Sequence, residues 1–336
     1  MLTPLLAKLR EQHPDAEIVM TCPVPFVPLY EHRPYGVIVI PYDPKDVKTF
    51  LSLWRVRGFD LALLPADNRY SWLSRALGSR KVVAFGGDTP EYKNWFVDEF
   101  RNYPSQPTAY GDIAAQLIDG EAPRPYQSKD WPAPSCTAFH LSNHLPSLPY
   151  CVLHLGASTP LKLWSAIHWR ALAQELKELG YQVVWSAGKQ EQHLVLEADP
   201  NGEFVSYAGA LDLAQLWALL AGAALLVCPD TGVAHLGRIT GVPTVTLFGP
   251  GSALMCGAGN FWRDSPYKSV SIEIACRDQD INFKRRVTWI RRCERFFPHQ
   301  CAQARCMEGI TLESVKNAAL GLLQDRAHQK TTPQQL

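Results

Sequence analysis

One helical turn of this chain carries four residues whose types suit the binding of a phosphate group. Asp230, Thr231, Gly232 and His235 lie in the string CPDTGVAH, which follows a short apolar run. Such a run is typical of a strand buried on both faces, and Asp230 is placed to cap a helix that begins at Thr231. The free N–H groups of that helix start point beyond the carboxyl edge of the sheet, where phosphates bind. An ordinary strand–helix–strand unit with a capping aspartate and no ligand is the alternative.

The sequence around this turn resembles a known family. The pattern Asp-Thr-Gly-x-x-His, followed by Gly-x-Pro-Thr-Val-x-Leu-Phe-Gly-Pro at 241–250, is similar to the donor-site signature of glycosyltransferase family 9, the heptosyltransferase-like enzymes of lipopolysaccharide assembly. The resemblance covers nearly the whole chain. It implies an α/β protein with two Rossmann-like doubly wound domains facing across a cleft (the GT-B arrangement), a nucleotide-diphosphate sugar as donor, and no required cofactor.

Transfer of a sugar from such a donor needs a group that stabilises the departing diphosphate. Lys162 is the candidate cation, because it lies in the loop GASTPLKLW after a predicted strand, on the same sheet edge as Thr231. The family pattern of small or hydroxyl residues, then a Lys before an aromatic residue, is matched loosely by this loop. Ser158 and Thr159 can donate to phosphate, although a Ser-Thr pair before Pro is also ordinary turn chemistry. A solvated lysine at a helix start is the alternative for Lys162.

The remaining donor-side residues have less specific patterns. Asp230 is a plain cap, an acceptor for donor hydroxyls, or both. Thr231 and Gly232 offer backbone N–H groups to the diphosphate, and glycine lets a phosphate approach closely. His235 lies one turn further along on the same face and is assigned to binding, not to catalysis, with simple packing as the alternative. Glu191 follows the second strand of this domain, where the family often recognises the nucleoside, and a carboxylate that only faces water is the alternative.

The general base that takes the proton of the acceptor hydroxyl has no assigned residue. In the resembling family the base is an Asp in a Gly-Asp loop, between the first strand and a helix like the one at Leu2–Leu9. This chain begins on that helix. We therefore expect that the true start lies upstream, after an apolar run ending in Gly-Asp, or that the chain is shortened and catalytically weak. Asp67 and Asp88 follow two strands of the first domain and are stand-in candidates, although polar residues at strand ends are ordinary.

The elements that position these residues alternate between strand and helix. In the first half, apolar runs predict strands at 17–20, 36–40, 61–64 and 81–85. Apolar residues at helical spacing predict intervening helices at 2–9, 47–54 and 70–77. In the second half, helices separate strands predicted at 151–155, 181–187, 204–207, 223–228 and 244–248, and a last helix covers 311–323. This alternation is typical of doubly wound parallel sheets.

At 336 residues the chain is too long for one ordinary α/β core and fits two domains. We predict an acceptor-side domain over 1–122, with its first strand missing, and a nucleotide-sugar-binding domain over 150–326. Six prolines and little periodicity predict a linker over 123–149. Residues 327–336 form a polar tail that we expect to fray.

Composition favours a cytoplasmic protein. A net charge of +1 gives no whole-chain argument for nucleic acid as a partner. No apolar run approaches the length of a membrane span, and the N-terminal sequence lacks the small-residue cleavage site of a signal peptide. Scattered cysteines favour a reducing compartment. The expected partners are a nucleotide sugar and a lipid-linked saccharide acceptor, with peripheral contact at the inner face of the cytoplasmic membrane.

Four of the nine cysteines crowd together near the C-terminus: Cys276, Cys293, Cys301 and Cys306. Residues 284–305 carry seven Lys or Arg against the single acid Glu294. Four thiolates around Zn²⁺ or iron would stabilise this segment, but the spacing contains no Cys-x-x-Cys pair. We predict free thiols, with a structural metal or disulfides as alternatives. The basic residues form a patch for an anionic acceptor or membrane, or a solvated face.

Three functions remain open from the sequence. The leading one is an inverting glycosyltransferase that moves a sugar, heptose in the resembling family, to a lipopolysaccharide-core or other lipid-linked acceptor. The second is a non-catalytic homologue that binds nucleotide sugars but lacks the base. The third is a nucleotide-sugar epimerase of the same fold, which is disfavoured because its acid and base carboxylates are not located.

Overall fold

The computed structural model describes residues 1–30, 32–135, 149–301 and 303–331. The chain divides into two compact units. Unit 1 comprises Met1–Pro132, Ala258–Asp264 and Gln279–Arg291, and unit 2 comprises Ala133–Gly257, Ser265–Asp278 and Arg292–Leu336. Two later segments of the chain therefore return to the N-terminal unit, which the sequence did not predict.

Unit 2 is built on one sheet of six parallel strands in the order β11-β10-β9-β6-β7-β8. The strands are β6 Tyr150–His154, β7 Gln182–Ser186, β8 Val205–Ser206, β9 Leu225–Pro229, β10 Thr244–Phe248 and β11 Tyr267–Ser271. The helices are α6 Ala166–Glu178, α7 Gln192–Ala198, α8 Leu213–Gly222, α9 Gly232–Thr240, α10 Ala253–Cys256, α11 Arg305–Glu308 and α12 Leu312–Thr331. All five predicted strands are present, and only β11 was missed. β11 was missed because its residues are mostly exposed and carry no apolar run.

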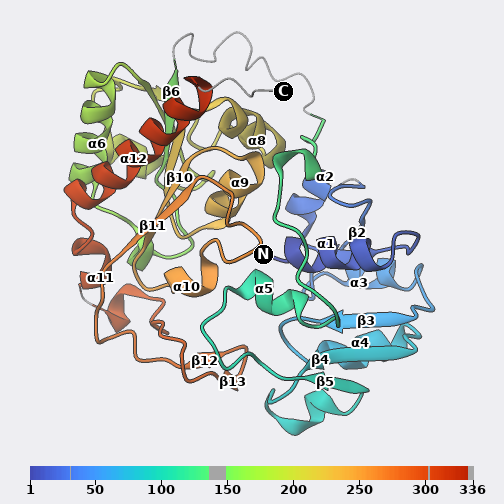
Figure 1. Ribbon diagram of the computed structural model, residues 1–336. Coiled ribbons are helices and arrows are strands. Elements are labelled where there is room, and N and C mark those ends of the chain that lie inside the picture. Colours follow the sequence, from blue (N-terminus) through green and yellow to red (C-terminus); the bar gives the residue numbers. More distant parts are fainter. Residues whose placement is uncertain (31, 136–148, 302, 332–336) are drawn as a thin grey trace. The chain divides into compact units, whose positions relative to one another are not determined.

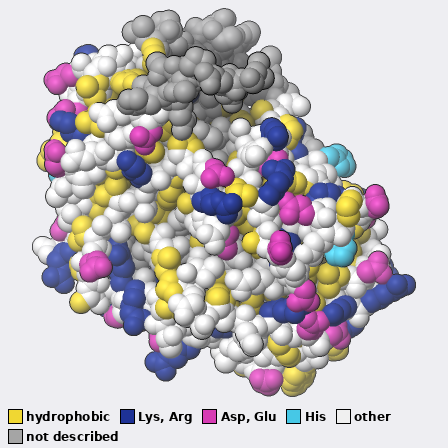
Figure 2. Space-filling model, viewed as in Figure 1, with side chains coloured by type: hydrophobic (Ala, Val, Ile, Leu, Met, Phe, Trp, Pro, Cys, Tyr) yellow, Lys and Arg dark blue, Asp and Glu magenta, His cyan; other side chains and the backbone are white. Residues whose placement is uncertain are grey.

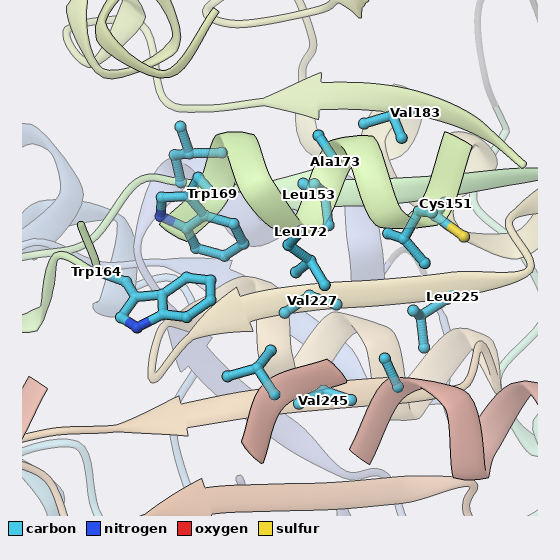
Figure 3. Close-up of a cluster of buried hydrophobic side chains, with 14 of the residues drawn as sticks. Cys151, Leu153, Trp164, Trp169, Leu172, Ala173, Val183, Leu225, Val227 and Val245 are labelled. Carbon is cyan, nitrogen blue, oxygen red and sulfur yellow. The ribbon is translucent and has the colours of Figure 1, made fainter. Parts of the chain in front are cut away.

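Both faces of this sheet are covered, α6 and α12 lying on one side and α8 and α9 on the other (Figure 1). Under α6, Trp169 and Leu172 pack against strand residues such as Leu153, Val227 and Val245 (Figure 3). Each of these side chains is at most 1% exposed. Burying a large apolar side chain contributes about 1.5–3 kcal/mol, so this cluster fixes the strands whose ends form the candidate site.

Unit 1 has two separate parallel sheets where the sequence predicted one. One sheet pairs β1 with β2, and the other has the order β3-β4-β5. The strands are β1 Val19–Cys22, β2 Ile38–Pro41, β3 Leu61–Leu64, β4 Lys81–Phe85 and β5 Glu99–Arg101, with a hairpin of β12 Ile281–Asn282 and β13 Arg285–Arg286. The helices are α1 Thr3–Gln12, α2 Val27–Tyr30, α3 Val47–Leu53, α4 Tyr70–Ala76 and α5 Tyr110–Ala115. Among the residues described, no strand pairs with the second edge of β1 or of β3.

Two boundaries differ from the prediction. The Pro-rich stretch is not a linker from its start, because Tyr126 and Trp131 are buried in unit 1 and the Trp131 indole donates to Leu29 O. Residues 136–148 of the predicted linker lie outside the described part. The predicted tail is helical as far as Thr331, since α12 continues to that residue.

The face of the protein in Figure 2 carries basic and acidic side chains interspersed, in line with the net charge of +1. Of the helices that the structure describes, none has the length and apolar content needed to cross a bilayer.

Candidate functional site

The loop after β6 meets the loop after β9 through a lysine–aspartate pair. Because β6 and β9 are parallel neighbours, their carboxyl ends lie at the same edge of the sheet. The Lys162 ammonium donates to the carboxylate Oδ2 of Asp230 at 2.8 Å and to the main-chain oxygen of Asp230 at 2.8 Å. The side chains are 20% and 11% exposed, so the pair is largely shielded but still reaches solvent. The sequence predicts Lys162 and Thr231 at one sheet edge, and there Lys162 contacts Asp230, the residue before Thr231.

The helix start is one residue later than predicted, and Asp230 does not cap it. Thr231 is the capping residue, with its hydroxyl accepting from Val233 N at 3.2 Å, and α9 begins at Gly232. The Asp230 carboxylate instead faces Lys162 and the turn after β10. A Cβ at Gly251 would lie 2.4 Å from Asp230 Oδ2, so the glycine leaves the space that this carboxylate occupies.

The start of α9 is open to a ligand. Gly232 is exposed, and no atom lies within 4 Å of the place where its Cβ would be. The first N–H groups of a helix have no partner within the helix. That of Val233 is taken by the Thr231 hydroxyl, and that of Ala234 goes to Thr231 O. The positive end of the helix dipole and the Gly232 N–H are thus presented beside the Lys162 ammonium, an arrangement that suits an anion.

His235 is held as a neutral imidazole. Its Nδ1 is hydrogen-bonded to a guanidinium nitrogen of Arg238, one turn further along α9. A guanidinium has only donors, so Nδ1 accepts and the proton lies on Nε2. Burial, together with the nearby cations Arg238 and Lys162, lowers the pKa of His235 well below its usual value. The side chain can therefore donate one hydrogen bond without carrying charge, which agrees with a binding role.

Arg238 was missed by the sequence reasoning. It is 3% exposed, donates to Cys256 O at 2.9 Å, and lies over the Tyr267 ring at 4.9 Å. The signal that could have identified it is its position three residues after His235, on the same helix face.

The two hydroxyl residues of the β6 loop differ from each other. Ser158 is exposed in the loop and remains a candidate donor to phosphate. Thr159 is buried, and its hydroxyl donates to Phe296 O at 2.5 Å and accepts from Leu161 N at 3.3 Å. Thr159 therefore caps the short 3-10 helix Pro160–Lys162 and fixes the position of Lys162, so the assignment of Thr159 to phosphate binding is replaced by a positioning role.

Glu191 neither faces water nor projects freely into the site. One carboxylate oxygen accepts from Ala157 N at 2.9 Å and the other from Gly188 N at 2.8 Å. A Cβ at Gly156 would lie 2.0 Å from the same carboxylate, so the glycine leaves the space that this carboxylate occupies. Glu191 thus joins the loops after β6 and β7, and it shapes the site through its backbone bonds rather than as an open nucleoside ligand.

The two stand-in bases of unit 1 are held in an ion-pair network. The Asp88 side chain is fully buried, accepts from Asn68 N at 2.8 Å and pairs with Lys93 at 3.2 Å. Asp67 pairs with the same lysine at 3.2 Å and with Arg69 at 3.0 Å. Burial alone would raise the pKa of Asp67, but hydrogen bonds from the Arg69 amide and Lys93 outweigh it and lower that pKa. A buried carboxylate and one with a lowered pKa are both poorly suited to act as a base.

This network contains a residue that sequence reasoning placed elsewhere. Arg285, read as part of an exposed basic patch, is 2% exposed. It donates to Asn68 Oδ1 at 2.7 Å and to the carbonyls of Phe85 and Gly86 at 3.0 and 2.9 Å, and it lies 3.6 Å from Asp88. Composition alone could not distinguish this buried arginine from Arg286, whose side chain is 81% exposed and pairs with Asp280.

The four C-terminal cysteines line one cavity of unit 2, together with Arg295 and the turn at Pro250. Cys306 is buried and the other three are half-buried. All eight cysteines in the part of the chain described carry free thiols, so the disulfide alternative is not what the structure contains. A tetrahedral ion with metal–sulfur bonds of ~2.3 Å needs sulfurs within roughly 4 Å of one another. Among the described residues no group of three or more Cys, His, Asp or Glu side chains is placed so that it could hold a metal ion.

Comparison with known proteins places this geometry in a family. Residues 52–278 match the model of glycosyltransferase family 9 (heptosyltransferase). Over 199 residues the chain is 31% identical to lipopolysaccharide heptosyltransferase 1 of Pseudomonas aeruginosa. The matched stretch covers 56% of this chain and 53% of that protein. The chain thus spans about half the length of this curated relative.

Solved structures agree with the predicted fold class. A family 9 glycosyl transferase from Veillonella parvula has a TM-score of 0.69 at 18% identity, covering 96% of this chain and 93% of its own. ADP-heptose lps heptosyltransferase II of E. coli has a TM-score of 0.67 at 18% identity, covering 96% and 94%. These likenesses confirm an α/β fold of the Rossmann-like GT-B class. Because the family model matches most of the chain, the protein belongs to glycosyltransferase family 9.

Proposed function

We propose that this protein is an inverting glycosyltransferase that moves a heptose from a nucleotide-diphosphate sugar to a lipopolysaccharide-core or other lipid-linked acceptor. Membership of family 9 supports the reaction class. The similar E. coli structure is described as an ADP-heptose heptosyltransferase, and on that basis we take ADP-heptose as the first donor to test. The acceptor chemistry implies work at the cytoplasmic face of the membrane.

The observation that carries this proposal is the placement of Lys162 beside the start of α9. An ammonium group has three donors, and two of them are used by Asp230. The third can meet a diphosphate oxygen, while the exposed Gly232 lets the same group approach the helix N-terminus. Negative charge grows on the diphosphate as the glycosidic bond breaks, and fixed positive groups stabilise that charge. In this proposal the Lys162 side chain and the N-terminus of α9 stabilise the departing diphosphate, and no metal is required.

The other residues of the site orient the donor. His235 supplies a neutral Nε2–H donor because its Nδ1 is occupied by Arg238. The exposed Ser158 can donate to the diphosphate from the other side of the β6 loop. Asp230 keeps the Lys162 ammonium in position, so its effect on binding is partly indirect.

A second candidate function is nucleotide-sugar binding without transfer. Inverting transfer needs a base for the acceptor hydroxyl. The burial of Asp88 and the ion pairs of Asp67 leave neither carboxylate suited to that role. Epimerisation of the sugar is the third candidate and needs acid and base carboxylates in the same way.

Product analysis with a panel of nucleotide sugars tests these candidates. The protein is incubated with ADP-heptose and other nucleotide-diphosphate sugars, with and without a delipidated core saccharide, and the products are identified by mass spectrometry and NMR. We expect a new glycosidic bond with inverted anomeric configuration. Calorimetric binding without turnover would support the second candidate, and an epimerised sugar the third. No affinity for any nucleotide diphosphate would contradict all three.

A further inference from the structure

The apolar stripe of α3 faces outward. Its apolar side chains follow the spacing i, i+3, i+4, i+7 at Val47, Phe50, Leu51 and Trp54. A helix normally buries such a stripe against the core. Here Val47 is 69% exposed, Phe50 36% and Leu51 59%. Phe50 and Trp54 pack edge to face at 5.9 Å, so the stripe forms a continuous apolar surface in unit 1.

The orientation of α3 is fixed by hydrogen bonds on its inner side. The buried Thr49 hydroxyl accepts from Asp43 N at 2.9 Å and donates to Asp46 O at 2.8 Å. Asp46 caps the helix by accepting from Lys48 N. Leu53 packs inward beside Thr49. Rotating α3 about its axis to bury the stripe would break these hydrogen bonds, so they hold the stripe at the surface of unit 1.

Positive charge surrounds the stripe. Four exposed cations flank the stripe: Lys45, Lys48, Arg55 and Arg57. The same segment has two exposed acids, Asp43 and Asp46, which accept from backbone N–H groups. Four cations against two acids give this segment a net charge of +2. Arg57 lies over the Trp54 ring at 5.2 Å. An apolar face with a tryptophan, flanked by lysines and arginines, matches the interface of an anionic bilayer.

We propose that α3 is a membrane-docking element, whose apolar stripe inserts among the headgroups of an anionic bilayer. This inference deepens the proposed function, since a lipid-linked acceptor lies in the same bilayer. A second copy of the chain fits less well, because two α3 faces would bring like charges together. The helix is short, so the contact is shallow and reversible.

Vesicle flotation tests the proposal with the full chain. We expect the protein to float with vesicles containing phosphatidylglycerol, and not with vesicles of phosphatidylcholine alone. Leu51→Ser and Phe50→Ser each remove an exposed side chain, so folding is expected to persist, and each should lower the bound fraction by about tenfold. Matched controls are Leu196→Ser and Ile167→Ser, which remove apolar side chains of unit 2 that are more exposed than Leu51 and Phe50 and should leave flotation unchanged.

A second pair of variants tests the charge. Lys48→Gln combined with Arg55→Gln should weaken flotation by about tenfold, whereas Lys129→Gln with Arg263→Gln, two exposed cations of unit 1, should not. Flotation that is insensitive to the α3 variants, or lost equally in the controls, would overturn the proposal. So would a dimer, seen by sedimentation velocity, that dissociates in Leu51→Ser without any vesicle binding. Transfer to the delipidated saccharide is measured on the same proteins, so loss of docking and loss of catalysis are read separately.

Discussion

The Lys162 ammonium lies 2.8 Å from both the carboxylate and the main-chain oxygen of Asp230, which precedes the capping residue of α9. The loops after β6 and β9 thus meet at the Lys162 ammonium, next to the start of α9. The lysine is positioned by Thr159 on its own loop and by Asp230 on the neighbouring one.

Removing this cation should weaken donor binding. We expect Lys162→Ala to weaken binding of a nucleoside diphosphate by about 1.5–3 kcal/mol, or roughly ten- to hundredfold, because a charge-assisted hydrogen bond is lost. Asp230→Ala should weaken it as well, since the ammonium loses its fixed partner. Isothermal calorimetry measures both. Lys177→Ala is the control, because Lys177 on α6 pairs with Glu203 and lies over the Phe204 ring. Unchanged affinity in both site variants would remove the donor-site assignment.

The buried arginine of unit 1 should be a determinant of stability. Arg285→Met removes the guanidinium that donates to Asn68 Oδ1 and lies 3.6 Å from the buried Asp88, and breaking a buried pair costs about 3–5 kcal/mol. Urea denaturation followed by tryptophan fluorescence should show this loss, and hydrogen exchange should locate it at β3 and β4. Arg286→Met is the matched control, because its pair with Asp280 lies at the surface and contributes little to stability. Equal stability of the two variants would contradict the network.

Acid should destabilise unit 2 through His154. This side chain is buried next to Ser186 Oγ at 3.0 Å, and burial lowers its pKa to about 4. The unfolded chain, with an ordinary pKa of about 6.5, therefore takes up a proton before the folded chain does. The stabilisation is full above about pH 6.5 and is lost as the pH falls towards 4, by about 2 kcal/mol at about pH 5.

Denaturation at a series of pH values checks this expectation. His154→Gln keeps a polar partner for Ser186 and should flatten the dependence between about pH 7 and pH 5. The exposed His193 provides the control, because His193→Gln should leave the slope as in the wild type. A slope that persists in His154→Gln would assign the effect to other groups.

The cysteine cavity should contain free thiols in the purified protein. The four side chains line one space but no three of the described metal-binding side chains converge. We expect elemental analysis of protein purified without added metal to find far less than one equivalent of zinc or iron. Near one equivalent, lost together in Cys293→Ser and Cys306→Ser but kept in Cys22→Ser, would reverse this expectation.

Much of unit 2 could be predicted from the sequence, because its strands are buried on both faces and read as apolar runs. The β6, β9 and β10 runs are examples, whereas α9 begins one residue after the predicted start. The roles of Thr159 and Glu191 could not be predicted, since both depend on partners distant in sequence, Phe296 and Ala157. A hydroxyl or carboxylate in a loop has the same sequence appearance whether it binds a ligand or the backbone.

In unit 1 the periodicity located α1, α3 and α4 but missed α2 and α5, and it did not show that the apolar face of α3 is exposed. The spacing of Val47 and Leu51 predicts an amphipathic helix equally well whether the apolar face packs inward or outward. The burial of Arg285 could not be predicted either, because a charged residue in a basic stretch is expected to be solvated. Only the return of residues 279–291 to unit 1 explains its burial.

The division of the unit 1 strands between two sheets has a consequence for assembly. In the part of the chain that the structure describes, β1 and β3 each have one edge that pairs with no other strand. The N–H and C=O groups along such an edge have no partner within the sheet. Such edges can accept an extended polypeptide through main-chain hydrogen bonds, while pockets for its alternate side chains give specificity. Unit 1 therefore has edge strands of the kind that favour edge-to-edge pairing with another extended chain.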